Sequence, residues 1–327
     1  MPHPPADADW LDAAARLALR ARPRSRPNPG VGAIVVSDGR VVGRGWTRPG
    51  GRPHAEAMAL DQAGARALGA SVFVTLEPCA HASERGPACA DRLIAAGVTR
   101  LVAGVRDPDP RTAGQGLENL RAAGIEAVEL GHAASRRSLA GYLTRAEHGR
   151  PHVTLKLALT LDGAIALGDR GSRWITGEAA RGHVHSRRAL ADAILVGGGT
   201  WRADAPRLDV RLNGLEGRSP ERWVLTSQAV DGAKSLAAPQ DIADMEGVQY
   251  LYVEGGAQTA AAFLTADLVD RLELYRAPIV AGRGRSAVAA IGLGDLAQAH
   301  HRWRLAGRRQ LGSDEFTAYE RSRCSPE

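Results

Sequence analysis

The stretch "SVFVTLEPCAHASERGPACADRLIAAG", residues 71–97, contains an apolar run, two cysteines and a helix-like segment. Residues 71–77 have the length and composition of a buried strand, and residues 89–97 those of a helix. Strand-like and helix-like segments alternate again in "TRLVAGV", "GLENLRAAG" and "IEAVEL", which lie within residues 99–130. This alternation predicts parallel pairing through right-handed crossovers, hence a three-layer α/β domain with helices on both faces of its sheet.

Upstream of this stretch, "VGAIVVSDGRVVGRGW", residues 31–46, predicts two strands joined by a hairpin turn at Asp38-Gly39. A helix is expected from about Ala55 to Ala63. The first domain should close near residue 148, which predicts domains over residues 1–148 and 149–327.

The second half, after Gly149 and Pro151, is also predicted to be α/β. A long strand-like run at residues 149–167 is followed by an expected helix from about Glu178 to Leu190. Further segments are expected as strands within residues 193–198, 221–227, 248–256 and 269–282, with a helix over residues 259–268 between the last two.

Composition and charge limit the classes of function. The chain has 327 residues, a net charge of +6 and a pI near 9.7, but aromatic residues make up only 4%. Base-stacking platforms are therefore scarce, and we expect a solvated arginine-rich surface rather than a nucleic-acid partner. No signal-peptide core and no apolar run of about 18 residues occurs, so we expect a cytoplasmic protein without a membrane contact.

The cysteines indicate metal chemistry. Three cysteines in a long chain do not suit a disulfide scaffold, and paired thiols in a reducing compartment are more often metal ligands or catalytic groups. Cys79 follows a predicted strand and Cys89 opens a predicted helix, whose dipole should favour a thiolate. His54 and Glu56 stand at the start of another helix. We therefore expect zinc at His54, Cys79 and Cys89, a water in the fourth position, and Glu56 as proton shuttle.

Zinc nucleobase deaminases use this ligand set together with a non-ligating glutamate. Zinc lowers the pKa of its water, and the glutamate takes up the proton and returns it to the departing ammonia. Nine residues separate the cysteines here, whereas the common deaminase spacing is Cys-x-x-Cys.

Four segments resemble the deaminase domain of the bifunctional deaminase–reductase family of bacterial riboflavin biosynthesis. They are "RPNPGVGAIVV" (26–36), "GRPHAE" (51–56), "VTLEPCAH…PAC" (74–89) and "DPDPRTAGQGLENLRAAGI" (107–125). The resemblance implies that Asn28 contacts the substrate pyrimidine. It also favours Arg85, the single basic residue of the loop between the cysteines, as a phosphate contact. The residues alone favour Asn28 as a turn residue, and they also allow Arg85 as a solvated arginine.

The second half resembles the family's reductase domain, which has a dihydrofolate-reductase-like fold. "LKLALTLDGAIA", "SRWIT", "GGGTWRADAPRLDVR" and "YVEGGAQTAAAFL" stand in the family's order, and the resemblance spans residues 10–312. It implies NADPH as cofactor, with contacts from Ala158, Trp174, Thr200, Asp204, Gly255 and Gly256. The implied contacts to the phosphorylated substrate are Ser172, Arg188, Leu208, Arg211 and Glu254.

Lys156 lies within the apolar run "TLKLAL", where an unpaired ammonium group would be costly to bury. We expect it to face a polar cavity or an acidic partner and to serve the reductase; the alternative is an edge-strand lysine facing water. Ala205 and Thr226 stand where the family usually has aspartate, so the rim of the reductase pocket should differ.

The resemblance implies hydrolytic deamination of 2,5-diamino-6-(5-phosphoribosylamino)pyrimidin-4-one, followed by NADPH-dependent reduction of its ribosyl group to ribityl. A homo-oligomer formed through the reductase domain is also expected. Two alternatives stay open: a nucleic-acid base deaminase with an accessory domain, and a non-catalytic binding module whose structural zinc takes His81 as fourth ligand.

Overall fold

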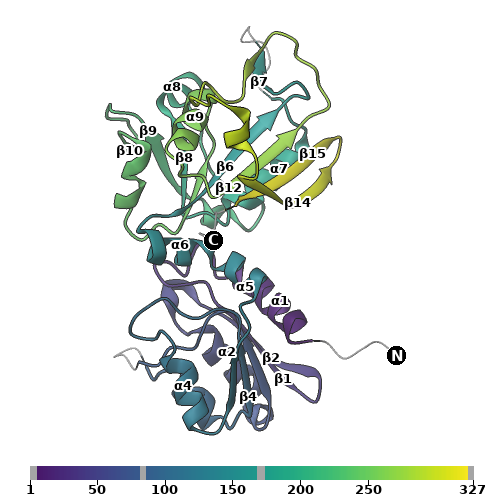
Figure 1. The fold of residues 1–327 in the computed structure, drawn as a ribbon, viewed down its shortest axis with the longest axis vertical. Helices are drawn as coiled ribbons and strands as arrows, with labels where there is room; N and C mark the ends of the chain where they lie inside the picture. The colour runs from purple at the N-terminus through teal and green to yellow at the C-terminus, as the bar shows by residue number, and fades with distance from the viewer. Residues whose placement is uncertain (1–5, 82–85, 168–173, 323–327) are drawn as a thin grey trace. The chain divides into compact units, whose positions relative to one another are not determined.

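The computed structural model describes residues 6–81, 86–167 and 174–322. The chain divides into two compact units, Met1–Gly149 and Arg150–Glu327, and each is described by itself. Figure 1 shows the helices and strands of both. Two residues with expected roles, Arg85 and Ser172, lie outside the described residues.

The first unit contains a five-stranded sheet with the order β2-β1-β3-β4-β5. Its strands are β1 (Gly32–Ser37), β2 (Arg40–Trp46), β3 (Ser71–Val74), β4 (Arg100–Ala103) and β5 (Glu126–Glu129). The predicted hairpin at Asp38-Gly39 is confirmed, with φ angles of 50° and 69° at the two turn residues. Strands β3, β4 and β5 are parallel as predicted, whereas β1 pairs antiparallel with both β2 and β3.

Helices cover both faces of this sheet, which confirms the three-layer prediction. The helices are α1 (Asp7–Ala18), α2 (Ala55–Ala63), α3 (Cys89–Ala95), α4 (Gln115–Ala122), α5 (Ala133–Ser138) and α6 (Ala140–His148). Side chains of α1 pack with Ile34, Phe73 and Val102 on one face. Side chains of α2, α3 and α4 pack on the other, with residues such as Val35 and Val72. The alternation of apolar residues along each strand therefore fills two cores.

Glycines let the backbone of α2 approach β2 closely. A methyl group at Gly45 would overlap the carbonyl oxygen of Ala55, and one at Gly43 would overlap that of Ala59. Only residues without a Cβ fit at these positions. This contact fixes the start of α2, where His54 is the N-cap residue.

The second unit has an eight-stranded sheet with the order β10-β9-β8-β11-β6-β12-β15-β14, and a small sheet of β7 and β13. The strands are β6 (His152–Leu159), β7 (Ala164–Leu167), β8 (Ala193–Gly197), β9 (Glu221–Leu225), β10 (Lys234–Leu236), β11 (Tyr250–Val253), β12 (Arg271–Arg276), β13 (Gly284–Ser286), β14 (Trp303–Leu311) and β15 (Asp314–Arg321). The strands from β10 to β12 in this order pair parallel, and β15 and β14 pair antiparallel at the far edge.

Helices α7 (Glu178–Arg188) and α9 (Ala257–Thr265) pack on opposite faces of this sheet, and α8 (Gly198–Asp204) follows β8 directly. Strand β6 lies in the interior of the sheet, and its side chains point alternately to the two faces. Its leucines belong to the core that packs against α9. Lys156 therefore points to the α7 face. The alternative of a water-facing edge-strand lysine is wrong.

The sequence predicted no strand beyond residue 282, and the structure adds β13, β14 and β15 there. Most residues of β14 are exposed or half-buried, and three of its nine residues are arginine. An edge strand of this kind has only a weak alternation of apolar and polar residues. Within the described residues, no helix is both long enough and apolar enough to cross a membrane.

We expect the substitution Gly45→Ala to destabilise the first unit by about 1–3 kcal/mol, because the added methyl group must push α2 away from β2. The same displacement should lower zinc content by moving His54. Denaturant unfolding and metal analysis of the purified protein measure both effects.

The matched control is Gly307→Ala in β14, where no atom lies within 4 Å of the added methyl group. If Gly45→Ala and Gly307→Ala are equally stable and bind equal zinc, the close approach does not position α2.

Candidate functional sites

Three expected zinc ligands converge in the first unit. His54 is the N-cap of α2 with extended backbone, Cys89 is the first residue of α3, and Cys79 lies beyond the carboxyl end of β3. His54 Nδ1 lies 3.2 Å from Cys89 Sγ and 3.6 Å from Cys79 Sγ. All three donor atoms lie within 4.8 Å of one another. Two sulfurs and one imidazole nitrogen at such distances fit a zinc ion with one coordination position left open.

The two thiols interact with each other, and their pKa values shift in opposite directions. Hydrogen bonds from Cys89 and His54 hold the pKa of the Cys79 thiol far below its usual value. The pKa of Cys89 is raised, because its thiol hydrogen-bonds to Cys79 and is buried. Zinc requires both thiols as thiolates, so binding releases a proton.

Glu56 lies in the first turn of α2 and is 4% exposed. Burial raises the pKa of its carboxyl to about 6. A carboxyl group with a pKa near neutrality can both accept and return a proton. Its place two residues after His54 puts it at the ligand cluster, as expected for a proton shuttle.

A second buried carboxylate, Glu77, supports the cluster and was missed by the sequence analysis. It follows β3 two residues before Cys79 and is 2% exposed. It accepts hydrogen bonds from the backbone N–H groups of Asp107, Gly114 and Leu117, at 3.2, 2.9 and 3.2 Å. These bonds tie the segment after β4 to the Cys79 segment. The signal in the sequence was a lone acidic residue at the end of an apolar strand, directly before Pro-Cys.

Two further residues considered in this unit, His81 and Asn28, lie outside the ligand group. His81 is not part of the ligand group among the described residues, and its Nδ1 lies 3.4 Å from Thr112 Oγ1. Asn28 Nδ2 donates to the Gly50 carbonyl at 3.4 Å, which places it beside the segment leading to His54. The geometry thus favours three protein ligands over a closed site with His81.

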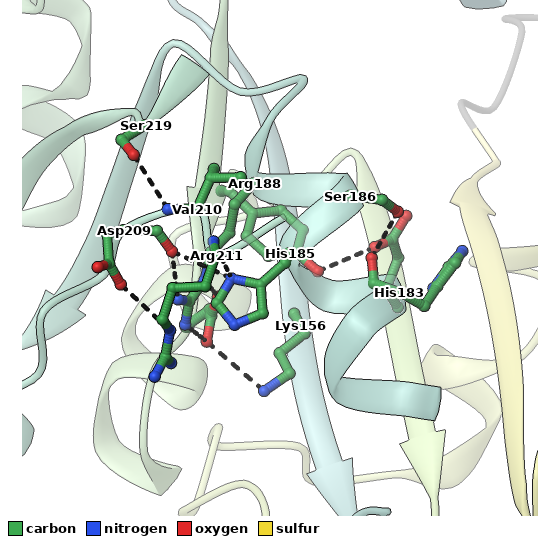
Figure 2. A network of polar contacts seen from close by, with 12 residues as sticks. Lys156, His183, His185, Ser186, Arg188, Asp209, Val210, Arg211 and Ser219 are labelled. Carbon is green, nitrogen blue, oxygen red and sulfur yellow. Dashed lines mark hydrogen bonds and ion pairs between the residues drawn. The ribbon is translucent and has the colours of Figure 1, made fainter. Parts of the chain in front are cut away.

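In the second unit, Lys156, Arg188 and Glu254 form one ionic cluster (Figure 2). Glu254 directly follows β11, and its side chain is 11% exposed. Its carboxylate accepts Arg188 Nε at 2.6 Å and Nη2 at 3.0 Å, and lies 3.6 Å from Lys156 Nζ. Burial alone would raise the pKa of Glu254, but Lys156 and Arg188 lower it to about 2. The carboxylate is therefore charged, and Lys156 has the acidic partner that the sequence predicted.

The segment containing Leu208 and Arg211 is held against α7. The Asp209 carbonyl accepts Arg188 Nη1 at 3.0 Å, and His185 Nδ1 lies 3.1 Å from the same oxygen. Leu208 is 4% exposed and has a φ of 53°. Arg211 is half exposed. These contacts bring Leu208 and Arg211 to the cluster of Arg188, although sequence reasoning missed His185 and Asp209.

The glycines and Thr200 gather where β8 and β11 end. Gly197 and Gly256 are the N-cap residues of α8 and α9, and a Cβ on Gly256 would lie 3.6 Å from Thr200 Oγ1. The two helix starts are therefore neighbours at the carboxyl ends of parallel strands, where backbone amides can approach an anionic dinucleotide. This arrangement fits NADPH.

The other three residues predicted to contact the cofactor do not lie at the starts of α8 and α9. Asp204 ends α8, and Ala158 lies two residues after Lys156 on the same face of β6. Trp174 is 57% exposed, with Arg181 Cζ 5.2 Å from the centre of its ring. Of the two departures from the family, Ala205 has a φ of 41°, and Thr226 lies against Gly198 at the start of α8.

Each of the two units matches a known protein family, and nearly the whole chain matches known proteins. Residues 5–105 match the family described as "Cytidine and deoxycytidylate deaminase zinc-binding region", and residues 151–316 match "RibD C-terminal domain". The riboflavin biosynthesis protein RibD of Escherichia coli is 35% identical over 90% of this chain and 94% of its own length. RibD of Mycobacterium tuberculosis H37Rv is 37% identical over 93% and 95%.

Solved structures give the same result. Acinetobacter baumannii RibD (form 1) has a TM-score of 0.84 at 32% identity, and covers 97% of this chain and 99% of its own. A diaminohydroxyphosphoribosylaminopyrimidine deaminase/5-amino-6-(5-phosphoribosylamino)uracil reductase of Thermotoga maritima has a TM-score of 0.83 at 29% identity, with the same coverage. Zinc is the cofactor of the deaminase domain and NADPH that of the reductase domain. The chain therefore belongs to the RibD family of bifunctional deaminase–reductases of riboflavin biosynthesis.

Proposed function

We propose that this chain deaminates 2,5-diamino-6-(5-phosphoribosylamino)pyrimidin-4-one and then reduces the ribosyl group, giving 5-amino-6-(5-phosphoribitylamino)uracil. The convergence of His54, Cys79 and Cys89 beside the buried carboxyl of Glu56 carries the proposal. The two activities named for the Thermotoga maritima structure support the order of the steps.

In the first step, the zinc ion would be held by His54, Cys79 and Cys89, and it would supply an activated water for addition to the ring carbon that bears the amino group. Glu56 accepts the proton released from this water and returns it to the nitrogen that leaves as ammonia. The burial of Glu56 suits this role, because it raises the pKa of the carboxyl group and so makes both proton transfers accessible near neutral pH. Asn28 orients the pyrimidine, and Arg85 contacts the phosphate.

In the second step, bound NADPH would supply the hydride that reduces the ribosyl group to ribityl. The residues proposed to hold the cofactor are Ala158, Trp174, Thr200, Asp204, Gly255 and Gly256. Lys156 provides a positive charge and a proton donor on the α7 face, and Glu254 orients it. Three N–H groups of Arg188 are already bonded to Glu254 and to the Asp209 carbonyl. Two further N–H groups of Arg188 are left for the substrate. The proposed contacts to the phosphorylated substrate are Ser172, Arg188, Leu208, Arg211 and Glu254.

Residues 1–148 form the deaminase domain and residues 149–327 the reductase domain in this proposal. We further propose a cytoplasmic homo-oligomer that associates through the reductase domain and binds no nucleic acid. Sedimentation analysis measures the oligomeric state. Salt-dependent binding of single-stranded RNA or DNA would instead favour the alternative of a nucleic-acid base deaminase.

The substitution Glu56→Gln should keep zinc and lower deamination by about 10²- to 10⁴-fold, because an amide cannot carry the proton. Reduction of the already deaminated substrate should continue. Metal analysis and separate assays of the two steps, with exposed Glu118→Gln as control, measure this. Loss of zinc together with deamination would mean that Glu56 holds the metal site rather than moving a proton.

The substitution Lys156→Ala should lower NADPH oxidation by about 100-fold or more while deamination and zinc content persist, because the ammonium group acts only in the second unit. Lys234 is the other lysine of the chain and pairs with Glu221 at the surface, at 2.9 Å, so Lys234→Ala is the matched control. NADPH oxidation at the same rate in both variants would exclude Lys156 from the reductase reaction.

A further inference from the structure

Asp209 lies between two arginines and forms ion pairs with both. Arg207 Nη2 lies 2.8 Å from Asp209 Oδ2, and Arg211 Nε lies 3.4 Å from Oδ1. The side chain of Asp209 is 21% exposed, whereas those of Arg207 and Arg211 are 78% and 52% exposed. A more deeply placed carboxylate thus holds two long side chains that extend into solvent.

The position of this carboxylate is fixed by its own backbone. The Asp209 carbonyl is bound by Arg188, which is bound in turn to Glu254 (Figure 2). The next residue, Val210, donates its N–H to Ser219 Oγ at 3.0 Å. Asp209 therefore stays in place beside the reductase cluster, while Arg207 and Arg211 retain freedom to change partners.

The two ion pairs are unequal. Asp209 Oδ1 is buried and has no hydrogen-bond partner among the described residues, because the 3.4 Å contact with Arg211 Nε lacks hydrogen-bond geometry. A loose contact of this kind holds an arginine weakly. Arg211 is the same residue that we assign to the phosphorylated substrate, so the more weakly held arginine is the one that a substrate anion needs.

We propose that Asp209 is a resident counter-ion with which the substrate phosphate competes for Arg207 and Arg211. This inference rests on the proposed function, and it adds Arg207 to the phosphate subsite. A phosphate group carries more charge and more acceptor oxygens than a carboxylate, so it can take over both arginines. Until it does, Asp209 neutralises part of their charge. The carboxylate therefore weakens the binding of every phosphorylated ligand, product included.

The substitution Asp209→Asn tests this, because it removes the negative charge and keeps the size of the side chain. We expect the inhibition constant of inorganic phosphate against NADPH oxidation, and the KM of the phosphorylated substrate, to fall about two- to tenfold. The gain should shrink in high salt, because the side chains of Arg207 and Arg211 are 78% and 52% exposed and salt screens their charges. Arg207→Ala should weaken phosphate inhibition.

Asp267→Asn is the matched control. Asp267 also lies between two arginines, Arg302 and Arg321, and its side chain is 60% exposed. The control makes the same change in net charge within the second unit, so equal effects of Asp209→Asn and Asp267→Asn would overturn the proposal. A rise in KM for Asp209→Asn would also overturn it, because the carboxylate would then be orienting the arginines for substrate.

Arg211→Ala separates this inference from the proposed function on which it rests. If Arg211→Ala leaves phosphate inhibition unchanged, Arg211 does not contact the phosphate, and the proposed substrate contact fails together with the inference. If Arg211→Ala weakens inhibition but Asp209→Asn does not strengthen it, the contact stands and only the role of Asp209 as competitor is wrong.

Discussion

Each site depends on a largely buried carboxylate that directly follows, or closely follows, a parallel strand. The negative charge of this carboxylate must be neutralised by hydrogen bonds or ion pairs, because little water reaches it. Uncompensated burial of such a charge would cost several kcal/mol. Glu77, after β3, is compensated by three backbone N–H groups from the segment after β4. Glu254, after β11, is compensated by Lys156 and Arg188. In each unit, satisfying one acidic group draws together the segments that carry the chemistry.

The second unit repeats this compensation on the α7 face. Glu273 on β12 is fully buried and pairs with Arg187 Nη2 at 2.8 Å and with Arg271 Nε at 2.9 Å. Arg187 and Arg188 are neighbours on α7, so the helix is fixed by two carboxylates, one on β12 and one directly after β11. Buried ion pairs add little net stability compared with apolar packing, but a lost partner is costly. The pairs therefore set where α7 lies on the sheet, and with it where Arg188 meets Glu254.

The sequence predicted the local features of the fold well and its long-range features less well. The hairpin at Asp38-Gly39 and the bounds of α2 depend on nearby residues, so both could be predicted. The position of α2 against β2 depends on missing Cβ atoms at Gly43 and Gly45, which a sequence pattern does not reveal. Strand β14 was missed because its pairing with β15, rather than its own composition, makes it a strand.

The zinc site was easier to predict from the sequence than the reductase site, because its ligand types are rare in this chain and arginines are common. The chain has three cysteines and ten histidines, so Cys79, Cys89 and His54 stand out at their spacing. Of its 42 basic residues only Lys156 and Lys234 are lysines, which leaves 40 arginines, and no spacing rule separates Arg188 from the rest. What distinguishes a functional arginine here is the acidic group it must neutralise. The scarce ligands can be found by residue type, whereas the arginines can be found only through the carboxylates that the fold places beside them.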